Sequence, residues 1–159
     1  MKQRARILLI LVIGVVFSSF NYAEKEEEEL DWFSWNTGYP KISESKKIGL
    51  IDVYTDWCGW CKRMDRDTYS KRSVIERINK NFVPIKFNPE AKGVYYVDDS
   101  TAYSGPQLYA MLTNGQSTGF PTTYFLVPNG NVLNVVGVAG YQDSASFAKI
   151  LDDVLGYVK

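Results

Sequence analysis

The sequence predicts an α/β protein in which one central mixed β-sheet is covered by helices on both faces. A short, almost continuous apolar run at residues 48–54 is followed by a helical pattern and a second strand-like run at 82–88. This order is typical of parallel strands joined by a helical crossover. Two later runs, 122–127 and 132–138, are rich in β-branched and aromatic residues and flank Pro128-Asn129-Gly130. That turn signal predicts an antiparallel hairpin, so the sheet contains both kinds of pairing.

Residues 1–23 have the pattern of a secretory signal peptide. Three of the first six residues are basic, and residues 7–17 form an apolar run that Gly14 does not break. The run is shorter than the roughly 20 residues that a membrane-spanning helix needs. Ala23 is a candidate cleavage point, and the alternative is an uncleaved N-terminal anchor. Either interpretation predicts an exported protein, periplasmic in a bacterium and tethered to the membrane if the segment stays attached.

Charge and composition exclude several classes of function. The chain has 18 basic and 18 acidic residues, and without residues 1–23 the net charge is −3. Nothing in this balance would attract nucleic acid. Residues 24–30 are predicted to be an acidic, solvated leader, and residues 31–159 suit one compact domain. Histidine is absent from the sequence, which excludes His-based metal sites and the usual Cys-His or Ser-His-Asp catalysts.

The middle of the chain predicts two helical pieces and an edge strand. Apolar residues recur at helical spacing within residues 62–80, with a break near Tyr69-Ser70. Pro84 cannot donate a hydrogen bond to a neighbouring strand, so the strand at 82–88 is placed at an edge of the sheet. Upstream, no helix is predicted, and three aromatic residues are expected to cover an edge of the core: Trp32, Trp35 and Tyr39.

The last third of the chain predicts two more helices. Residues 94–97 are read as a short strand. Ser104 is a plausible N-cap for a helix at 106–113 that Gly115 ends. Asp143 is predicted to cap the final helix, whose apolar residues form one stripe: Phe147, Ile150, Leu151, Val154 and Leu155.

The segment YTDWCGWCK, residues 54–62, contains both cysteines of the chain, Cys58 and Cys61. A zinc site needs four ligands, and this motif supplies two, with no histidine or third cysteine to complete the set. A structural disulfide here would close a loop that is nearly closed already, so it would gain little stability. A redox pair is the interpretation that remains favoured. It requires neither a metal nor another cofactor.

The position of the motif between a strand and a helix assigns different roles to the two cysteines. Cys58 would lie at the helix N-terminus, where unpaired N–H groups and the helix dipole stabilise a thiolate. It is therefore predicted to attack the substrate disulfide. Cys61, one turn further in and more shielded, would then resolve the mixed disulfide. Lys62 either adds to the stabilisation of the thiolate or is simply solvated.

Asp52 is a candidate proton carrier. A carboxylate within an apolar strand is desolvated, which raises its pKa toward neutrality. Such a group can accept the proton of Cys61 when that thiol attacks the mixed disulfide. The alternative is that Asp52 lies at a strand end with its carboxylate in water.

These residues resemble the thioredoxin superfamily, in which WCxxCK opens the redox helix. Residues 119–122, GFPT, resemble the loop whose proline is cis and faces the disulfide. Asp52 matches the buried aspartate of thioredoxins, and Lys86 matches the lysine that pairs with it. The resemblance covers about residues 31–158. It is closest to secreted bacterial thioredoxin-like proteins with a DWCGWCK motif and to reductase domains of periplasmic electron-transfer proteins.

The resemblance implies a thioredoxin fold and a thiol–disulfide oxidoreductase that acts on protein substrates. In that family a cis Pro121 would turn the Phe120 backbone toward the cysteines, where an extended substrate chain can pair with it. A trans proline opening a strand is the alternative. Trp60 serves either packing or substrate contact. Together the expected substrate contacts are Trp57, Gly59, Trp60, Phe120 and Pro121, beside the redox residues Cys58, Cys61, Asp52 and Lys86.

The direction of electron flow is predicted from the residue between the cysteines. Trp60 offers no charge to stabilise a thiolate, which favours a reductase of exported disulfides supplied by a membrane-bound electron donor. The alternatives are a disulfide oxidase or isomerase, and a binding module with an idle CxxC pair. The chain departs from thioredoxin in the Gly59-Trp60 dipeptide, the bulk of Phe120 and the longer segment 91–118. These departures leave the substrate open.

Overall fold

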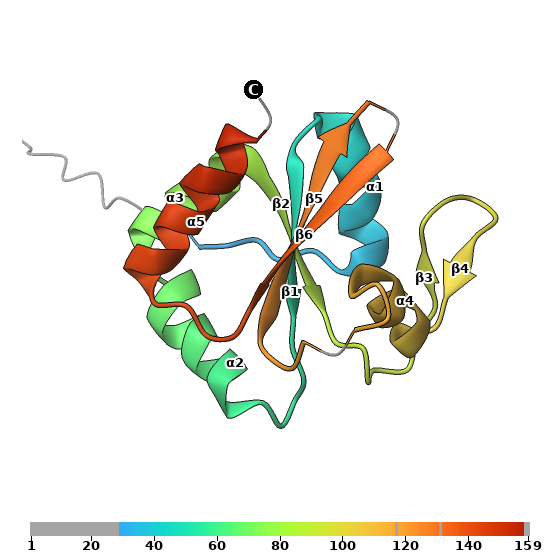
Figure 1. The fold of residues 1–159 in the computed structure, drawn as a ribbon, viewed down its shortest axis with the longest axis horizontal. Coiled ribbons are helices and arrows are strands. Elements are labelled where there is room, and N and C mark those ends of the chain that lie inside the picture. The colour runs from blue at the N-terminus through green and yellow to red at the C-terminus, as the bar shows by residue number, and fades with distance from the viewer. Residues whose placement is uncertain (1–28, 117, 131, 158–159) are drawn as a thin grey trace, which may run out of the picture.

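A four-stranded mixed sheet in the order β2-β1-β5-β6 lies at the centre of the computed structural model (Figure 1). The structure describes residues 29–157 except residues 117 and 131, so the predicted signal segment lies outside the described residues. The elements are α1 (Trp35–Ser45), β1 (Ile48–Val53), α2 (Gly59–Met64), the π-helical turn η1 (Asp65–Tyr69), α3 (Arg72–Asn81), β2 (Phe82–Phe87), β3 (Tyr95–Tyr96), β4 (Ala102–Tyr103), α4 (Gly105–Leu112), β5 (Thr122–Asn129), β6 (Val132–Ala139) and α5 (Ser144–Gly156).

The strand directions confirm the predicted sheet. β1 and β2 run parallel, β5 runs antiparallel to β1, and β6 pairs antiparallel with β5 as a hairpin. The register of β1 and β2 places Asp52 opposite Lys86. The two candidate partners therefore lie side by side on neighbouring strands.

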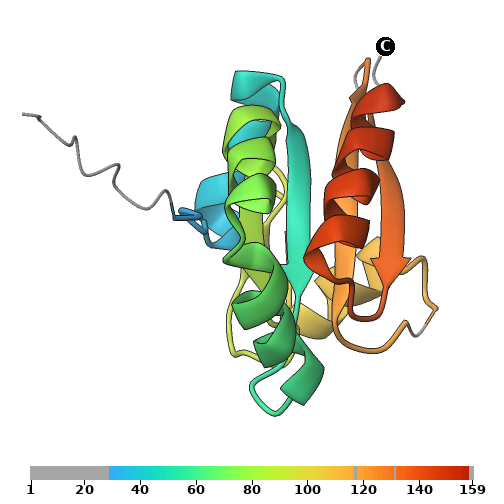
Figure 2. The ribbon, with the colours of Figure 1, turned by 90° about the vertical axis from the view of Figure 1, so that its left-hand side faces the viewer.

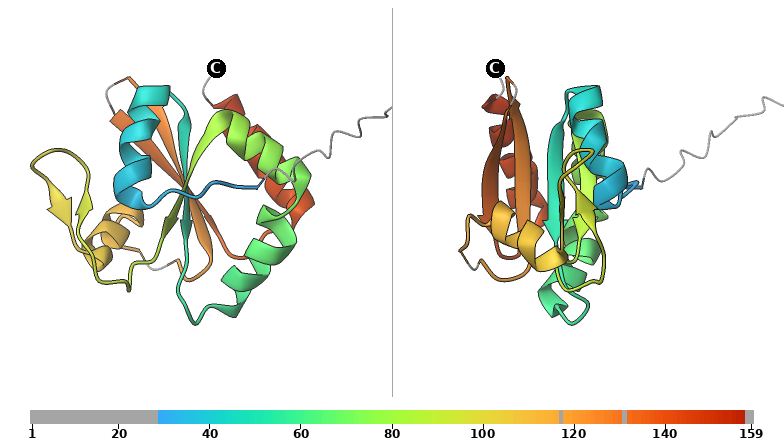
Figure 3. Two further views of the ribbon diagram at one scale, coloured as in Figure 1. Left: turned by 180° about the vertical axis from the view of Figure 1, so that it is seen from behind. Right: turned by 90° about the vertical axis from the view of Figure 1, so that its right-hand side faces the viewer.

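Helices cover both faces of the sheet, as predicted. On one face, α2, η1, α3 and α5 pack over a cluster that includes Leu50, Phe125 and Phe147 (Figures 1 and 2). On the other face, α1 and α4 pack over a cluster that includes Ile51 and Val53 (Figure 3). β1 contributes alternate side chains to the two clusters, and all six of its residues are buried. This explains its nearly continuous apolar sequence.

β2 forms an edge of the sheet, as Pro84 predicts. Its outer side is partly covered by the backbone of Phe33, whose N–H donates to Pro84 O (2.9 Å) and whose carbonyl accepts from Lys86 N (3.0 Å). The outer edge is thus the side on which β2 can tolerate a residue without an N–H. The adjoining residues 29–34 run along the same side of the domain, and Leu30 packs partly against the core.

The helix α1 was not predicted, and the expected role of Trp35 is wrong. Trp35 is buried within the core and stacks on Tyr39 at 4.8 Å between ring centroids, instead of covering an edge. Gly38 and Pro40 are both inside the helix, and both residue types weaken helices. A Cβ at Gly38 would overlap the side chain of Ile85 of β2, so glycine at this position lets α1 pack closely on that strand. Tertiary packing therefore overrides the local sequence preference.

The remaining elements follow the predictions with small shifts. The helical pattern of 62–80 is divided into α2 with η1 and then α3, and the break falls at residues 70–71. The predicted strand near 94–97 is β3, which pairs with the unpredicted β4 as a separate hairpin. Trp35 anchors that hairpin by donating from Nε1 to Tyr96 O (2.8 Å).

Both predicted helix caps are present. The Ser104 N–H donates to Gln107 Oε1 at the start of α4, and Asp143 Oδ1 accepts from the Ser146 N–H at the start of α5. Within the part of the chain that the structure describes, no helix is both long enough and apolar enough to cross a membrane.

Candidate active site

A disulfide joins Cys58 and Cys61 where β1 ends and α2 begins, with a Cα–Cα distance of 5.3 Å. Cys58 is the N-cap of α2, and its Sγ accepts the N–H of Cys61 at 3.0 Å. The predicted position of Cys58 at a helix N-terminus is therefore confirmed. The predicted difference in shielding is not, because both residues are 4% exposed. Because the disulfide holds the two sulfur atoms together, the two residues are buried to the same extent.

The loop before β5 lies against the cysteine motif. The Phe120–Pro121 peptide bond is cis, which confirms the prediction from the resemblance. The Phe120 ring meets Trp57 edge to face at 5.8 Å and stacks on Tyr109 of α4 at 5.7 Å. Phe120 therefore lies beside Trp57, although the two residues are 63 positions apart in the sequence.

The surface around the disulfide is aromatic and accessible. Trp57 is 66% exposed and Trp60 is 54% exposed. Gly59, between Cys58 and Trp60, has no neighbour within 4 Å of the position where a Cβ would lie. Trp57 is held in place because its Nε1 donates to Glu90 Oε2 at 2.9 Å. Trp57, Gly59 and Trp60 are therefore exposed beside the disulfide, whereas Phe120 is half-buried and Pro121 is buried. Their role in binding stays a prediction.

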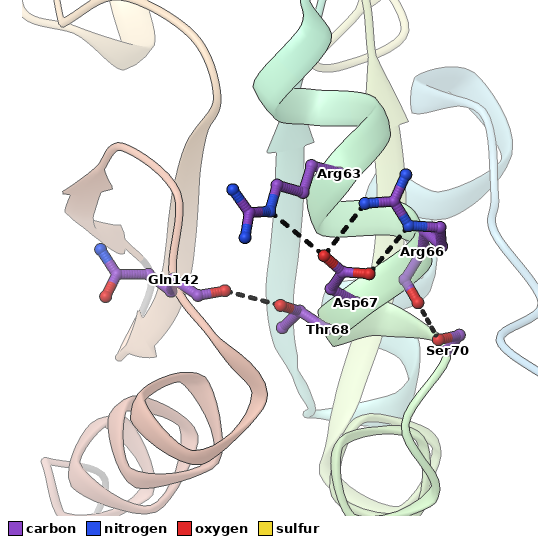
Figure 4. A network of polar contacts seen from close by, with 6 residues as sticks. All are labelled: Arg63, Arg66, Asp67, Thr68, Ser70 and Gln142. Atoms are coloured by element: carbon purple, nitrogen blue, oxygen red, sulfur yellow. Dashed lines mark hydrogen bonds and ion pairs between the residues drawn. The ribbon is translucent and has the colours of Figure 1, made fainter.

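Trp60 also takes part in packing, on the side of the site that faces α5. The Arg63 guanidinium lies 5.1 Å from the ring centroids of both Trp60 and Tyr141. Arg63 and Arg66 both bond to the carboxylate of Asp67 (Figure 4). These contacts fix the start of the redox helix against the residues that connect β6 to α5.

A further hydrogen bond ties the end of the same helical segment to that connection. Thr68 Oγ1 donates to the carbonyl of Gln142 at 2.6 Å (Figure 4). Lys62 is exposed, in keeping with its interpretation as a solvated residue.

Asp52 is buried beneath the motif, with 2% exposure, so the alternative of a carboxylate in water is wrong. Its Oδ2 lies 3.1 Å from Lys86 Nζ, and its Oδ1 accepts from the Tyr69 hydroxyl at 3.4 Å. Desolvation raises the pKa of Asp52 above its ordinary value, and the nearby Lys86 ammonium only partly offsets this. The carboxyl group is thus prepared to hold a proton at a higher pH than a solvated aspartate.

Asp65 is a member of this site that the sequence analysis missed. Its Oδ1 lies 2.5 Å from Lys86 Nζ, so one ammonium group serves two carboxylates. Burial alone would lower the pKa of Lys86, but Asp52 and Asp65 together raise it. The available signal was the spacing, because Asp65 follows Cys61 by four positions and shares its face of the helix.

Three aromatic rings surround the same ammonium group. Lys86 Nζ lies 5.0 Å from the ring centroid of Trp32, 5.1 Å from Tyr54 and 5.9 Å from Tyr69. These rings stabilise the cation by cation–π attraction and keep it in place. Among the described residues, no group of three or more Cys, Asp or Glu side chains could hold a metal ion.

The chain is similar in sequence to one family and to several known proteins. The Thioredox_DsbH family, described as "Protein of unknown function, DUF255", matches residues 17–159. The chain is 28% identical over 104 residues to the thiol:disulfide interchange protein DsbD of Klebsiella pneumoniae, covering 65% of this chain and 15% of that protein. It is 27% identical over 83 residues to an uncharacterized protein of Archaeoglobus fulgidus, covering 52% of this chain and 65% of the relative. The chain thus spans only a small part of its DsbD relatives.

Solved structures establish the fold. A thioredoxin from Thermus thermophilus superposes with a TM-score of 0.66 at 20% identity, covering 82% of this chain and 90% of the other. A DsbH oxidoreductase gives 0.56 at 17% identity, with 80% and 85% covered. The oxidised C-terminal domain of Neisseria meningitidis DsbD gives 0.51 at 19% identity, with 74% and 89% covered. The predicted thioredoxin fold is confirmed, and the chain belongs to the Thioredox_DsbH family.

Proposed function

We propose that this protein is a thiol–disulfide oxidoreductase that reduces disulfides in exported proteins. The observation that carries the proposal is the Cys58–Cys61 disulfide at the N-terminus of α2, with Cys58 Sγ accepting a backbone N–H. An N–H group that points at this sulfur stabilises the thiolate when the disulfide is opened. The DsbD and DsbH names of the similar proteins support the same class of chemistry.

The proposed reaction begins with the reduced pair. The Cys58 thiolate attacks one sulfur of a substrate disulfide, and the other substrate sulfur leaves as a thiolate. Cys61 then attacks Cys58 Sγ, which releases the second substrate sulfur and forms the disulfide seen here. Two electrons pass from the dithiol to the substrate. Asp52 is the proposed acceptor of the Cys61 proton, because desolvation raises its pKa above that of a solvated aspartate and makes it a stronger base.

Protein substrates are proposed to bind across the exposed surface around Cys58. Trp57, Gly59 and Trp60 would contact one side of an extended chain, and the backbone of Phe120 beside Pro121 would pair with it. The exposure of the two tryptophans supports this role, since neither ring is taken up by the core.

The reductase direction is proposed from the charges near the disulfide. Trp60 offers no charge to a thiolate, while Asp52 and Asp65 place two carboxylates around one ammonium. Without a cation from that position, the thiolate is less stabilised than it would be with one, and a less stabilised reduced form makes a stronger reductant. We further propose that the protein works outside the cytosol and receives electrons from a membrane-bound dithiol donor. Its export rests on the predicted signal segment.

The reduction potential of the Cys58–Cys61 couple tests this proposal. The purified protein is equilibrated with thiol buffers of defined potential, and the fraction reduced is determined by alkylation. A value near the thioredoxin potential, about −270 mV, supports a reductase. A value near about −120 mV would instead indicate an oxidase. A pair that never equilibrates, while a short CxxC peptide does so in the same buffers, would identify a binding module.

A further inference from the structure

Thr55 is buried beside the cysteine pair with an unsatisfied hydroxyl group. Among the side-chain atoms that the structure describes, Thr55 Oγ1 is the one buried nitrogen or oxygen without a hydrogen-bond partner. The residue is 1% exposed and connects β1 to the cysteine motif. Its carbonyl accepts the N–H of Cys58 at 3.1 Å, so a backbone turn folds Cys58 directly onto it.

Other buried threonines of this domain have partners. Thr68 donates to the carbonyl of Gln142, Thr122 to the carbonyl of Gly119, and Thr123 shares a hydrogen bond with Tyr69. A buried hydroxyl without a partner costs free energy, and valine fills the same space without that cost. Thr55 is therefore an exception in a core that otherwise satisfies its hydroxyl groups.

We propose that the Thr55 hydroxyl donates a hydrogen bond to Cys58 Sγ when the disulfide is reduced; this inference rests on the proposed function. The structure contains the oxidised pair, in which the sulfur is uncharged and bonded to Cys61. Reduction turns it into a thiolate, a far stronger acceptor of hydrogen bonds. The hydroxyl that is unsatisfied in one redox state is thus satisfied in the other. Thr55 then acts as a residue that stabilises the nucleophile.

The electrons and protons of this step balance. A dithiol such as dithiothreitol breaks the S–S bond and becomes a disulfide itself, supplying two electrons. Cys61 Sγ takes up one proton, and Cys58 Sγ remains a thiolate. The Thr55 O–H bond stays intact, because the hydroxyl donates a hydrogen bond and not its proton.

The test compares the redox equilibrium of Thr55→Val and Thr55→Ser in the full domain. Without the hydroxyl, the reduced form loses a charge-assisted hydrogen bond while the oxidised form loses nothing. We expect the equilibrium constant for reduction by dithiothreitol to fall about tenfold in the valine variant, or about 30 mV toward stronger reduction. Thr55→Ser keeps the hydroxyl and should stay within about twofold of the parent. Alkylation of reduced Cys58 at neutral pH should slow in the valine variant alone.

A matched control separates this effect from a general loss of packing. Thr68→Val removes another buried threonine hydroxyl, whose hydrogen bond to Gln142 is independent of the cysteines. Thr68→Val should lower the stability of the oxidised and reduced forms equally. The equilibrium constant for reduction by dithiothreitol should therefore stay unchanged. Thr55→Ala supplies a second variant without the hydroxyl if valine disturbs folding.

Two outcomes would overturn the inference. The first is an equal equilibrium constant for the parent and Thr55→Val. It would show that the hydroxyl is unsatisfied, or bound to water, in both redox states. The second is alkylation that slows at Cys61 and not at Cys58 in Thr55→Val. It would show that the hydroxyl acts on the sulfur of Cys61, contrary to the proposal. If the parent pair itself failed to equilibrate with dithiothreitol, the proposed function would fail and this inference with it. A parent that equilibrates with the same constant as Thr55→Val would overturn this inference alone.

Discussion

At the scale of single residues, the buried carboxylate of Asp52 is the most consequential group of the site. Its desolvation is costly, yet Lys86 does not depend on it alone, because Asp65 binds the same ammonium group. Removing the Asp52 charge would therefore leave Lys86 paired. This separates Asp52 from the usual buried ion pair, in which loss of one partner leaves the other uncompensated.

Asp52→Asn is expected to slow resolution of the mixed disulfide about a hundredfold, the lower range for loss of a positioned proton acceptor. The attack by Cys58 should be nearly unaffected, because that step requires no proton transfer to Asp52. Rapid-quench measurement of the mixed-disulfide lifetime checks both steps. Asp56→Asn is the matched control, since Asp56 is exposed next to the motif. Equal lifetimes in Asp52→Asn and parent would remove Asp52 from the mechanism.

The same variant should be more stable than the parent at neutral pH. Desolvation raises the pKa of Asp52 in the folded protein above the ordinary 3.8. The folded state therefore retains this proton after the unfolded chain has lost it, and the parent loses stability as the pH rises through that interval. Asparagine does not titrate, so the variant avoids this loss of stability. We expect its free energy of unfolding to exceed that of the parent by about 1–4 kcal/mol at pH 7 and to match it below about pH 4. Urea unfolding of the oxidised proteins measures it, and lower stability of the variant at pH 7 would contradict this account.

At the scale of elements, the close approach of α4 to the chain after β2 positions the aromatic side of the site. A Cβ on Gly105, at the first position of α4, would overlap the backbone carbonyl of Pro89. α4 also carries Tyr109, on which Phe120 stacks. The helix start thus depends on the absence of a side chain at one position.

Gly105→Ala is expected to destabilise the domain by about 1–3 kcal/mol, because a backbone atom cannot move aside as a side chain can. Gly156→Ala is the control: Gly156 lies in α5 with no neighbour within 4 Å of the position of a Cβ. That change should be neutral or stabilising by up to about 1 kcal/mol. The midpoints of urea unfolding of both variants test this prediction. Equal midpoints would show that α4 can move away from Pro89 without a loss of stability.

The elements that the sequence predicted are those whose signal is local. β1, the β5–β6 hairpin and α5 carry their own apolar pattern, turn residues or cap. By contrast, α1 contains Gly38 and Pro40, and it exists because Trp35 and Ile42 are buried against the sheet. β4 is two residues long, and its pairing with β3 has no periodic pattern to detect.

The candidate site divides in the same way. Cys58, Cys61 and Pro121 belong to recognisable motifs. The resemblance to thioredoxins predicts that Lys86 pairs with Asp52, and the register of the parallel strands places the two opposite each other. Asp65 and Thr55 act through contacts made by packing a helix on a strand end or by burying one hydroxyl. Asp65 follows Cys61 at helical spacing, but its contact with Lys86 depends on how the helix packs against the strand. The unsatisfied hydroxyl of Thr55 has no counterpart in the sequence pattern.

At the scale of the whole molecule, two apolar clusters on opposite faces of the sheet hold the fold together. The disulfide closes a loop of four residues, for which the chain-entropy estimate is only about 2 kcal/mol. Neither cysteine belongs to either cluster.

Reduction is therefore expected to leave the domain folded and to lower its free energy of unfolding by about 2 kcal/mol or less. Urea unfolding with and without dithiothreitol measures the difference. The double variant Cys58→Ser and Cys61→Ser should match the reduced protein, because it lacks the same crosslink. Unfolding on reduction would instead make the disulfide a structural staple and would weaken the proposed redox role.

The two edges of the sheet differ in a way that limits how copies of this protein can join. Along β2, the Phe82 N–H is used by Ile78, Pro84 has no N–H, and Phe33 bonds to Pro84 and Lys86. β6 is the other edge strand; it carries no charged residue and exposes valines. A further strand would therefore add at β6. Two copies joined there would leave the partly covered β2 edges outermost, so growth of such an assembly beyond a pair would be hindered.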